Sequence, residues 1–268
     1  SYANLDFATV KGFSLELITQ RIGILRTNLA YTMQFAEGTG SSFSSSRAAL
    51  NGVEGFTVLR TLLPLSFDQR HTFTGNIDIR WEDVPGGNNQ KGPKIGNFYP
   101  LRNFGASLTF NMGSGTPFSR NALPNQADVQ YGVNSTSQVR GTAFGSRLPF
   151  NFRMDLRINR EFYIKFASRT TGEGTDGAPA QNSRERGLSL DVYMVFLNLL
   201  GTENILGVYQ YSGLPDNSGF LESAQGEVAI QSYGIDRQAF IDQFRIKERT
   251  PDNYSLPRRI RLGLLLSF

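Results

Sequence analysis

The residues best suited to chemistry lie close together in the chain: Asp68, Arg70 and His71. An imidazole beside a carboxylate can serve as a general base. His71 is the only histidine and cysteine is absent, which excludes disulfides, thiolate metal sites and a histidine-built zinc site. No nucleophile can be assigned to His71, so the favoured interpretation is a local hydrogen-bonded corner. We therefore expect no enzyme activity and no cofactor.

A metal site is not expected either. The acidic residues Glu82, Asp83 and Glu203 are the nearest approach to a calcium site. They lack the regular spacing of oxygen ligands that a dedicated calcium loop requires. The sequence therefore predicts no bound metal.

Charge and hydropathy exclude two further classes. The chain has 27 basic and 23 acidic residues, and no block of like charges that would form a nucleic-acid arm. The most apolar stretch, residues 192–200, is too short for a membrane-spanning helix and contains Asn198. Residues 1–6 do not resemble a signal peptide, so we expect a mature, trimmed or fragmentary chain.

The dominant pattern is alternation of apolar and polar residues with period two, which is typical of strands whose faces meet different surroundings. In residues 72–81, for example, Phe73, Ile77 and Trp81 alternate with polar residues. We predict about seven strands, at residues 10–19, 25–35, 72–81, 104–112, 150–166, 188–196 and 259–268.

These strands are long, and their connections alternate in length. Most predicted strands have about ten residues or more, as a tilted strand needs to cross a bilayer. The predicted connections are long at 36–71, 113–149 and 197–258, and shorter at 20–23, 82–103 and 167–187. Outer-membrane barrels have long outward loops and short periplasmic turns. The pattern thus favours an antiparallel transmembrane β-barrel over a soluble sandwich, which also alternates.

Aromatic residues near the predicted strand ends are candidates for the girdles at the two membrane interfaces. These are Tyr31, Phe35, Trp81, Tyr163, Phe166 and Phe268. An odd strand number is unusual for a bacterial barrel, so we expect either missing upstream strands or a hidden eighth strand at residues 227–233. A short loop helix is expected at residues 236–247, where Ala239, Phe240 and Phe244 have helical spacing.

Several motifs, in order along the chain, resemble the TonB-dependent outer-membrane receptors of Bacteroidota, whose N-terminal part holds a carboxypeptidase-regulatory-like domain and a plug. Residues 68–73 resemble a D-x-R-H-x-F strand start, 114–118 an SGTPY strand end, and 148–157 an LP…R-x-D-L-R strand. Residues 198–205 resemble NLFNxxN and 208–216 a VY-x-x-TG-x-P-D element. Residues 257–268 resemble the closing strand, whose terminal aromatic, Phe268, is the barrel-insertion signal.

The resemblance implies that residues 1–268 form the C-terminal part, approximately the last seven strands, of a plugged barrel of about 22 strands with long extracellular loops. It implies active transport across a bacterial outer membrane of a ligand such as a siderophore, glycan or peptide. The implied partners are membrane lipid, a plug and further strands in the same protein or another chain, the TonB complex through the missing N-terminal part, and a possible surface lipoprotein lid. No nucleic-acid partner is expected.

Two groups of residues are candidate site residues. Charged residues predicted to face the barrel interior could line a substrate path, contact the plug, or pair across strands: Asp78, Arg80, Arg153, Asp155, Arg157, Asp191, Arg259 and Arg261. Aromatic residues of the last loop could bind a ligand or pack the loop on its neighbours: Tyr209, Tyr211, Phe220, Tyr233, Phe240, Phe244 and Tyr254.

Two other functions stay open at this stage. A complete barrel of about eight strands could act as an adhesin or structural anchor, and its first strand would then pair with its last. An outer-membrane hydrolase would need a Ser or Asp partner within hydrogen-bond reach of His71.

Overall fold

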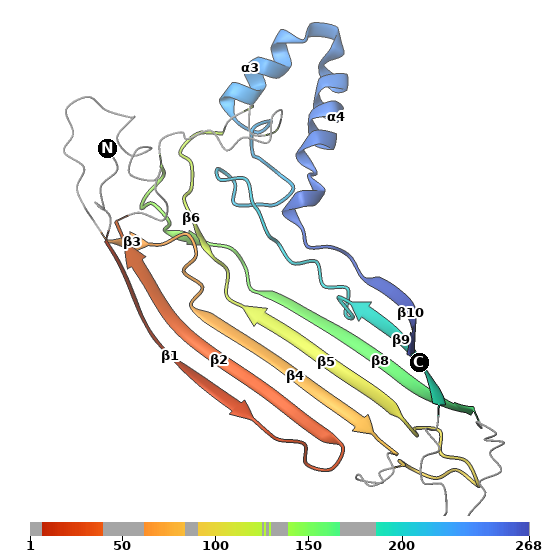
Figure 1. Ribbon diagram of the computed structural model, residues 1–268. Coiled ribbons are helices and arrows are strands. Elements are labelled where there is room, and N and C mark those ends of the chain that lie inside the picture. Colours follow the sequence, from red (N-terminus) through yellow and green to blue (C-terminus); the bar gives the residue numbers. More distant parts are fainter. Residues whose placement is uncertain are drawn as a thin grey trace, which may run out of the picture.

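The protein is dominated by one antiparallel sheet in a computed structural model that describes residues 7–39, 62–83, 91–124, 126, 129, 139–166 and 186–267 (Figure 1). Its long strands are β1 (Ala8–Ile18), β2 (Leu25–Gly38), β4 (His71–Trp81), β5 (Phe104–Gly113), β8 (Asn151–Phe166), β9 (Arg186–Leu197) and β10 (Arg259–Ser267). The short strands β3 (Leu63–Pro64), β6 (Pro117–Phe118) and β7 (Ser146–Arg147) lie in the connections. The prediction of an all-β fold with about seven long strands is confirmed.

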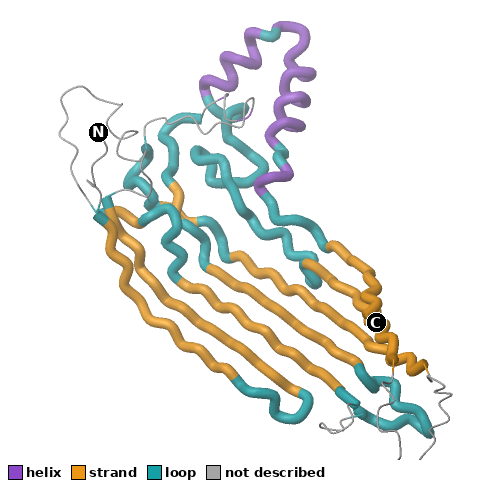
Figure 2. The backbone as a smooth tube through the Cα atoms, viewed as in Figure 1, coloured by secondary structure: helices purple, strands orange, loops and turns teal. Residues whose placement is uncertain are grey.

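Each long strand pairs antiparallel with the next long strand along the chain. The order is β1-β2-β4-β5-β8-β9-β10, so β1 and β10 are the two edges of the sheet among the described residues. Figure 2 shows the strands as one continuous layer. A sheet built this way needs only connections between neighbours, as in an up-and-down meander.

The strand ends gather at two ends of the sheet. The ends of β2, β5 and β9 and the starts of β4, β8 and β10 lie at one end, which we call the loop end (Figure 1). The ends of β1, β4 and β8 and the starts of β2, β5 and β9 lie at the other, which we call the turn end. The β1–β2 turn is tight: Ile22 and Leu25 exchange backbone hydrogen bonds of 2.9 and 3.2 Å across Gly23. Gly23 has a φ of 64°, which glycine adopts without strain.

The register sorts the strand residues into two faces. Ile77 pairs with Leu108, Leu108 with Leu156, and Leu156 with Phe196, and this row is typical of the apolar face. The adjacent row joins Asp78 to Ser107 and Ser107 to Arg157, on the polar face. The alternation in the sequence therefore becomes a two-faced sheet, because side chains point to opposite faces at successive positions.

No second layer of the described protein covers the apolar face. Leu262 and Leu264 are 69% and 67% exposed, and Leu15 on the opposite edge strand is 64% exposed. The buried hydrophobic residues of the described chain lie elsewhere: Ala36, Leu65, Val129, Tyr209, Phe220 and Phe244. A two-layer soluble core is therefore not present in the part of the chain that is described.

The β9–β10 connection folds into a separate helical unit beyond the loop end. It contains α3 (Ala224–Ser232) and α4 (Arg237–Glu248), which pack against each other (Figure 1). The short 3-10 turns η1 (Gly234–Asp236) and η2 (Pro251–Asn253) flank α4. None of the described helices has the length and apolar character needed to traverse a membrane.

One helix was predicted and the other was not. The expected helix at residues 236–247 is confirmed as α4. The expected hidden strand at residues 227–233 is wrong, because these residues belong to α3 except for Tyr233 at its C-cap. The Ser223 hydroxyl accepts the Gly226 N–H at 3.1 Å and caps α3, and Ala229 packs on the loop core, so local capping and packing favour a helix.

Candidate functional site

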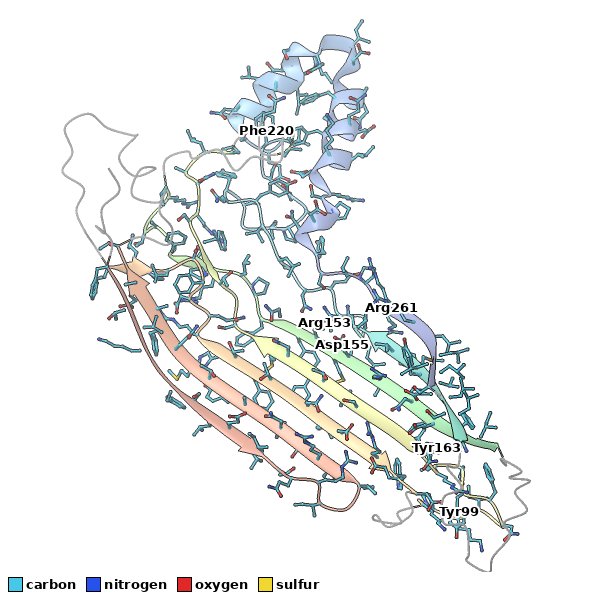
Figure 3. The ribbon with its side chains drawn as sticks, in the orientation of Figure 1. Tyr99, Arg153, Asp155, Tyr163, Phe220 and Arg261 are labelled. Atoms are coloured by element: carbon cyan, nitrogen blue, oxygen red, sulfur yellow. The ribbon has the colours of Figure 1, made fainter. Side chains whose placement is uncertain are left out.

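The polar face of the sheet carries all eight charged residues expected to face a barrel interior. Asp78 and Arg80 lie on β4, Asp191 lies on β9, and the others lie on β8 and β10. Figure 3 shows Arg153 and Asp155 toward the loop end of β8, with Arg261 nearby on β10. The register thus unites residues that are separated by up to 183 positions, from Asp78 to Arg261, on one surface.

Pairing between neighbours accounts for several of these charges. Arg153 Nε lies 3.0 Å from Asp155 Oδ1, and Arg157 Nη2 lies 3.9 Å from Asp191 Oδ2. The Asn159 side-chain amide also donates to Asp191, at 3.2 Å. These contacts support the interpretation that much of the polar face is a wall of paired side chains.

Two other members of the group have partners outside it. Arg21, in the β1–β2 turn, lies 2.6 Å from Asp78, and Arg80 lies 3.4 Å from Glu82. Both partners lie at the turn end of the sheet. Exposed ion pairs of this kind contribute little stability, so they are best understood as neutralising a hydrated surface.

A depression of about 450 Å³ lies where the polar face meets the loop end, and its lining includes Arg153, Arg259 and Arg261. The Asp155 carboxylate pairs with the Arg153 guanidinium and accepts a hydrogen bond from the Asn198 backbone N–H at 2.8 Å. Within the described residues Arg259 and Arg261 form no ion pair. The depression therefore has an excess of positive charge and suits an anionic group.

Asn198 closes this depression and was not recognised as a site residue from the sequence. It is buried and has a φ of 54° at the end of β9. Its amide donates to the Thr202 and Leu256 carbonyls at 2.9 and 3.1 Å, and its oxygen accepts the Thr202 N–H at 3.0 Å. This one side chain holds the exit of β9 against the approach to β10. The asparagine interrupting an apolar run was the available signal.

Asn204 joins the same region to β8. Its side-chain amide donates to the Phe152 carbonyl at 2.8 Å, and its oxygen accepts the Phe152 N–H at 2.7 Å. These two bonds imitate the exchange between paired strand residues. Together with the Ser255 hydroxyl, which accepts the Asn204 N–H at 3.1 Å, they fix the base of the long loop on the sheet.

The buried Asp68 carboxylate lies at the centre of another group of residues at the loop end, which we call the Asp68 cluster: Ala36, Asp68, Arg70, Gly115 and Arg147. Asp68 accepts the Ala36 N–H at 2.9 Å and pairs with the Arg147 guanidinium, with Arg70 3.5 Å away. Arg147 also donates to the carbonyls of Asp68 and Gly115, at 2.8 and 3.3 Å. Two neighbouring loops are therefore tied together at their bases.

The Asp68 carboxylate is held in its charged form. Burial by itself would raise the pKa of Asp68, but the hydrogen bonds from Ala36 and Arg147 and the charges of Arg147 and Arg70 together lower it below the usual value. A buried, ionised carboxylate that accepts from three donors of its own protein is not presented to a substrate. Its geometry is that of a structural tie. The predicted corner forms around Asp68 and Arg70, but His71 is not part of it.

His71 does not form a catalytic pair with Asp68. Its Nδ1 is 2.9 Å from the Tyr31 hydroxyl, and the two rings are stacked with centroids 6.3 Å apart on the apolar face. Ser114 approaches only the backbone, where its hydroxyl accepts the His71 N–H at 3.0 Å. Among the described residues, no Ser or Asp side chain forms a hydrogen bond with the His71 imidazole, as a hydrolase would need.

The aromatic residues of the last loop mainly build its own core. Tyr209, Phe220 and Phe244 are buried together with Val129 of the neighbouring β5–β8 loop, and Phe240 packs beside them. Figure 3 shows Phe220 within this helical unit. The Phe220 and Phe244 rings are stacked with centroids 5.3 Å apart. The interpretation that these aromatics pack the loop on its neighbour is confirmed for this cluster.

The remaining loop aromatics lie around that core. Tyr211 covers Gly219, Tyr233 stacks on Phe240 with centroids 4.3 Å apart, and Tyr254 forms a bridge with Ile205. Tyr233 is 48% exposed. Of this group it is the residue best placed to contact another molecule.

Three of the expected girdle residues are either on the other face of the sheet or outside the described residues. Tyr163 pairs with Ser189 and follows Glu161 on the polar face, so its assignment to an apolar-face girdle is wrong. It was assigned by its nearness to a strand end, and alternation along β8 places it on the other side. The Phe166 side chain and Phe268, the expected insertion signal, lie outside the described residues.

The acidic residues considered for calcium have other partners. Asp83 lies 2.7 Å from Arg102 and 3.8 Å from Lys91, while Glu82 pairs with Arg80. The described part of the chain has no group of three or more acidic or histidine residues arranged to hold a metal ion.

Comparisons with protein-family models, with curated proteins and with solved structures gave no match.

Proposed function

We propose that this chain is the C-terminal part of a transmembrane β-barrel in a bacterial outer membrane, and that the complete protein is a TonB-dependent receptor. In this proposal the loop end is extracellular and the turn end is periplasmic. Residues 1–268 supply about seven of roughly 22 strands, with a plug and further strands in the same protein or another chain. The transported ligand is a siderophore, glycan or peptide.

The uncovered apolar face is the observation that carries the proposal. Apolar side chains on one side of the sheet are exposed on the edge strands β1 and β10 and at least partly exposed on the strands between them, and the main contacts of each long strand are with its neighbours in the sheet. A surface of this size is unusual on a protein surrounded by water. Hydrocarbon is a solvent in which such a face is stable and the backbone is satisfied by strand pairing.

The unpaired edges of β1 and β10 favour a barrel of more strands than the seven in the described sheet. In a bilayer the outer backbone groups of β1 and β10 need partners, because lipid cannot hydrogen-bond to them. A complete small barrel would satisfy them by pairing β1 with β10, and these strands lie at opposite edges of the described sheet. Additional strands on each side are the remaining solution, and an adhesin-type small barrel is not favoured.

The polar face then forms part of the barrel wall facing the plug and the ligand path. The positive depression around Arg153, Arg259 and Arg261 opens on this face just below the extracellular loops. It is positioned to receive a carboxylate or phosphate from either the plug or an arriving ligand. No catalytic step is part of this proposal.

Single-cysteine labelling tests the membrane placement. The 268 residues contain no cysteine, so Ile77→Cys and its neighbour Asn76→Cys form a matched pair on opposite faces of β4 once any cysteine elsewhere in the full-length protein is replaced. In isolated outer membranes, we expect Ile77→Cys to react with a lipid-soluble maleimide and to resist a charged one. Equal reaction of both variants with the charged reagent would contradict the proposal.

Energy dependence tests the transport role. Cells producing the full-length protein are offered siderophores, glycans or peptides, with and without a functional TonB complex. We expect uptake of one ligand class to require both the protein and TonB. Uptake that persists equally without TonB would remove the receptor assignment and leave only the barrel.

A further inference from the structure

Arg160 interrupts the apolar face of β8. The apolar-face positions from Phe152 to Phe166 alternate with polar ones, and Arg160 is the charged residue among them. Its partners across the strands are Phe104 and Val192, which are both apolar. A guanidinium in this position faces the same surroundings as the hydrophobic side chains beside it.

Arg160 has no counter-ion in the described protein. Its guanidinium lies 5.1 Å from the centre of the Phe162 ring and 6.0 Å from that of Phe98. The nearby carboxylates are directed elsewhere: Glu161 belongs to the polar face, and Asp83 pairs with Arg102 at 2.7 Å. The two rings orient the cation, and no acceptor among the described residues is bonded to its N–H donors.

The position of Arg160 matches the boundary of the proposed membrane. Arg160 pairs with Phe104, and Phe104 pairs in turn with Trp81. Phe104 is the first residue of β5 and Trp81 the last residue of β4, so both aromatics lie at the turn end of their strands. Aromatic residues at strand ends mark the level of the lipid headgroups. A charged side chain is tolerated at this level, whereas it is costly near the centre of the bilayer.

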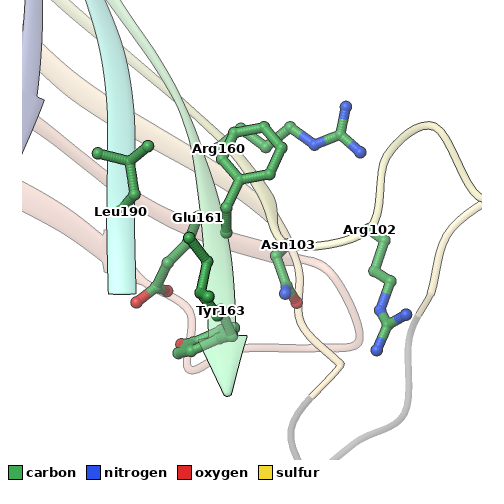
Figure 4. A pocket seen from close by; sticks show the side chains of 8 residues that line it. Arg102, Asn103, Arg160, Glu161, Tyr163 and Leu190 are labelled. Atoms are coloured by element: carbon green, nitrogen blue, oxygen red, sulfur yellow. The ribbon is translucent and has the colours of Figure 1, made fainter. Parts of the chain in front are cut away.

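Two adjoining depressions surround this cation. One, of about 560 Å³, is lined by residues that include Arg102, Arg160 and Phe162, with Glu161 on the polar-face side. Figure 4 shows Arg102 and Arg160 extending to one side of β8, while Glu161 extends to the other. The second, of about 220 Å³, shares Arg160 and Phe162 and continues along Ile158, Met194 and Leu262 toward the loop end. The Arg160 guanidinium thus stands where the first depression adjoins an apolar groove directed toward the centre of the sheet.

We propose that this composite groove binds an anionic phospholipid of the periplasmic leaflet, with its phosphodiester on Arg160 and an acyl chain along the apolar groove. The inference rests on the proposed membrane placement. Charge complementarity selects the phosphate, and the direction of the groove from headgroup level toward the bilayer centre selects a lipid over a free anion. Arg102 and Asp83 compensate each other's charge at 2.7 Å, so Arg160 is the cation on which the proposal rests.

The test uses the full-length protein in a neutral detergent and measures lipid binding by native mass spectrometry. The probes are phosphatidylglycerol, zwitterionic phosphatidylcholine, and inorganic phosphate as the soluble competitor. We expect phosphatidylglycerol to bind more tightly than phosphatidylcholine, and Arg160→Gln to weaken phosphatidylglycerol binding about tenfold. Arg249→Gln, which removes the same charge from the exposed end of α4, is the matched control and should bind as the wild type does.

Phe98 lies outside the named strands, so Phe98→Leu gives a second test if Arg160→Gln does not assemble. Removing one of the two rings that orient the guanidinium should weaken phosphatidylglycerol binding by a smaller factor. Unchanged affinity in Arg160→Gln, or in Phe98→Leu when only that variant assembles, would overturn the site. Displacement of the lipid by equimolar inorganic phosphate would show a free-anion site and also overturn it. Failure of the wild-type protein to enter lipid vesicles at all would instead overturn the membrane placement.

Discussion

The sheet and the β9–β10 loop differ in how far their hydrophobic side chains are exposed. In the loop, Phe244 is 4% exposed and packs in a small core, whereas Leu264 on β10 is 67% exposed. The loop buries its large apolar side chains in a core of its own, as is favourable for a protein surrounded by water. The sheet leaves its apolar face for something outside the described chain. Under the proposed membrane placement, this contrast corresponds to water around the loop and lipid against the apolar face of the sheet.

The largest expected effect concerns the loop core. Phe244→Ala removes a buried ring that stacks on Phe220, and should lower the local stability of the loop by about 3–5 kcal/mol while the sheet stays intact. Hydrogen exchange across α3 and α4 measures this. Ile246→Ala, two positions away and 73% exposed, is the control and should have little effect. Similar effects of the two substitutions would mean that the loop has no core of its own.

A charge in the middle of the apolar face should have the next largest effect. Ile77→Arg should destabilise the protein in lipid vesicles by about 2–4 kcal/mol, because an arginine would face hydrocarbon. Urea-induced unfolding of the full-length protein in vesicles measures the difference. Asn76→Arg places the same charge on the polar face and should cost little. If both variants lose equal stability, the two faces do not differ in solvent.

A packing change on the same face should have a smaller effect. The Phe110 ring lies directly over Gly75, where an added Cβ would come within 2.1 Å of it. Gly75→Ala should therefore displace the ring and cost about 1–3 kcal/mol in the same unfolding measurement. Adding Phe110→Leu should recover part of the loss. An additive effect of the two substitutions would show that the ring and the glycine are not in contact.

The smallest effect should come from titrating Asp68. Because its pKa is lower in the folded than in the unfolded protein, the stability it contributes is fully present above about pH 4 and is lost as pH falls through the folded-state value. We expect pepsin cleavage in the adjoining loops to accelerate over that range. Asp68→Asn should flatten this dependence, and an unchanged pH profile in that variant would exclude Asp68 as the titrating group.

The sequence predicted the strands because their signal is local. Alternation in residues such as Phe73, Ile77 and Asp78 reports the face of each side chain whatever the strand's neighbours are. It failed at residues 227–233, where the Ser223 cap and packing against the Phe244 core favour α3 over a strand. The girdle prediction also failed at Tyr163, which lies near the end of β8 but at a position that alternation places on the polar face.

The candidate site was predicted only in part. The charged residues of the polar face follow from the same alternation, but their pairing does not. Arg147 meets Asp68 across 79 positions, and Asn198 reaches the Leu256 carbonyl across 58. No local pattern encodes such contacts, because they depend on which loops the strand order brings together at the loop end.

The sequence by itself determined that the chain forms long two-faced strands with polar connections, since period-two alternation and turn residues act over a few positions. The tertiary structure alone decided that Arg160 lies beside an apolar groove with no counter-ion among the described residues, and that Arg259 and Arg261 share a depression with Arg153. The physical reason is that charge compensation depends on distances between strands, and the register sets those distances.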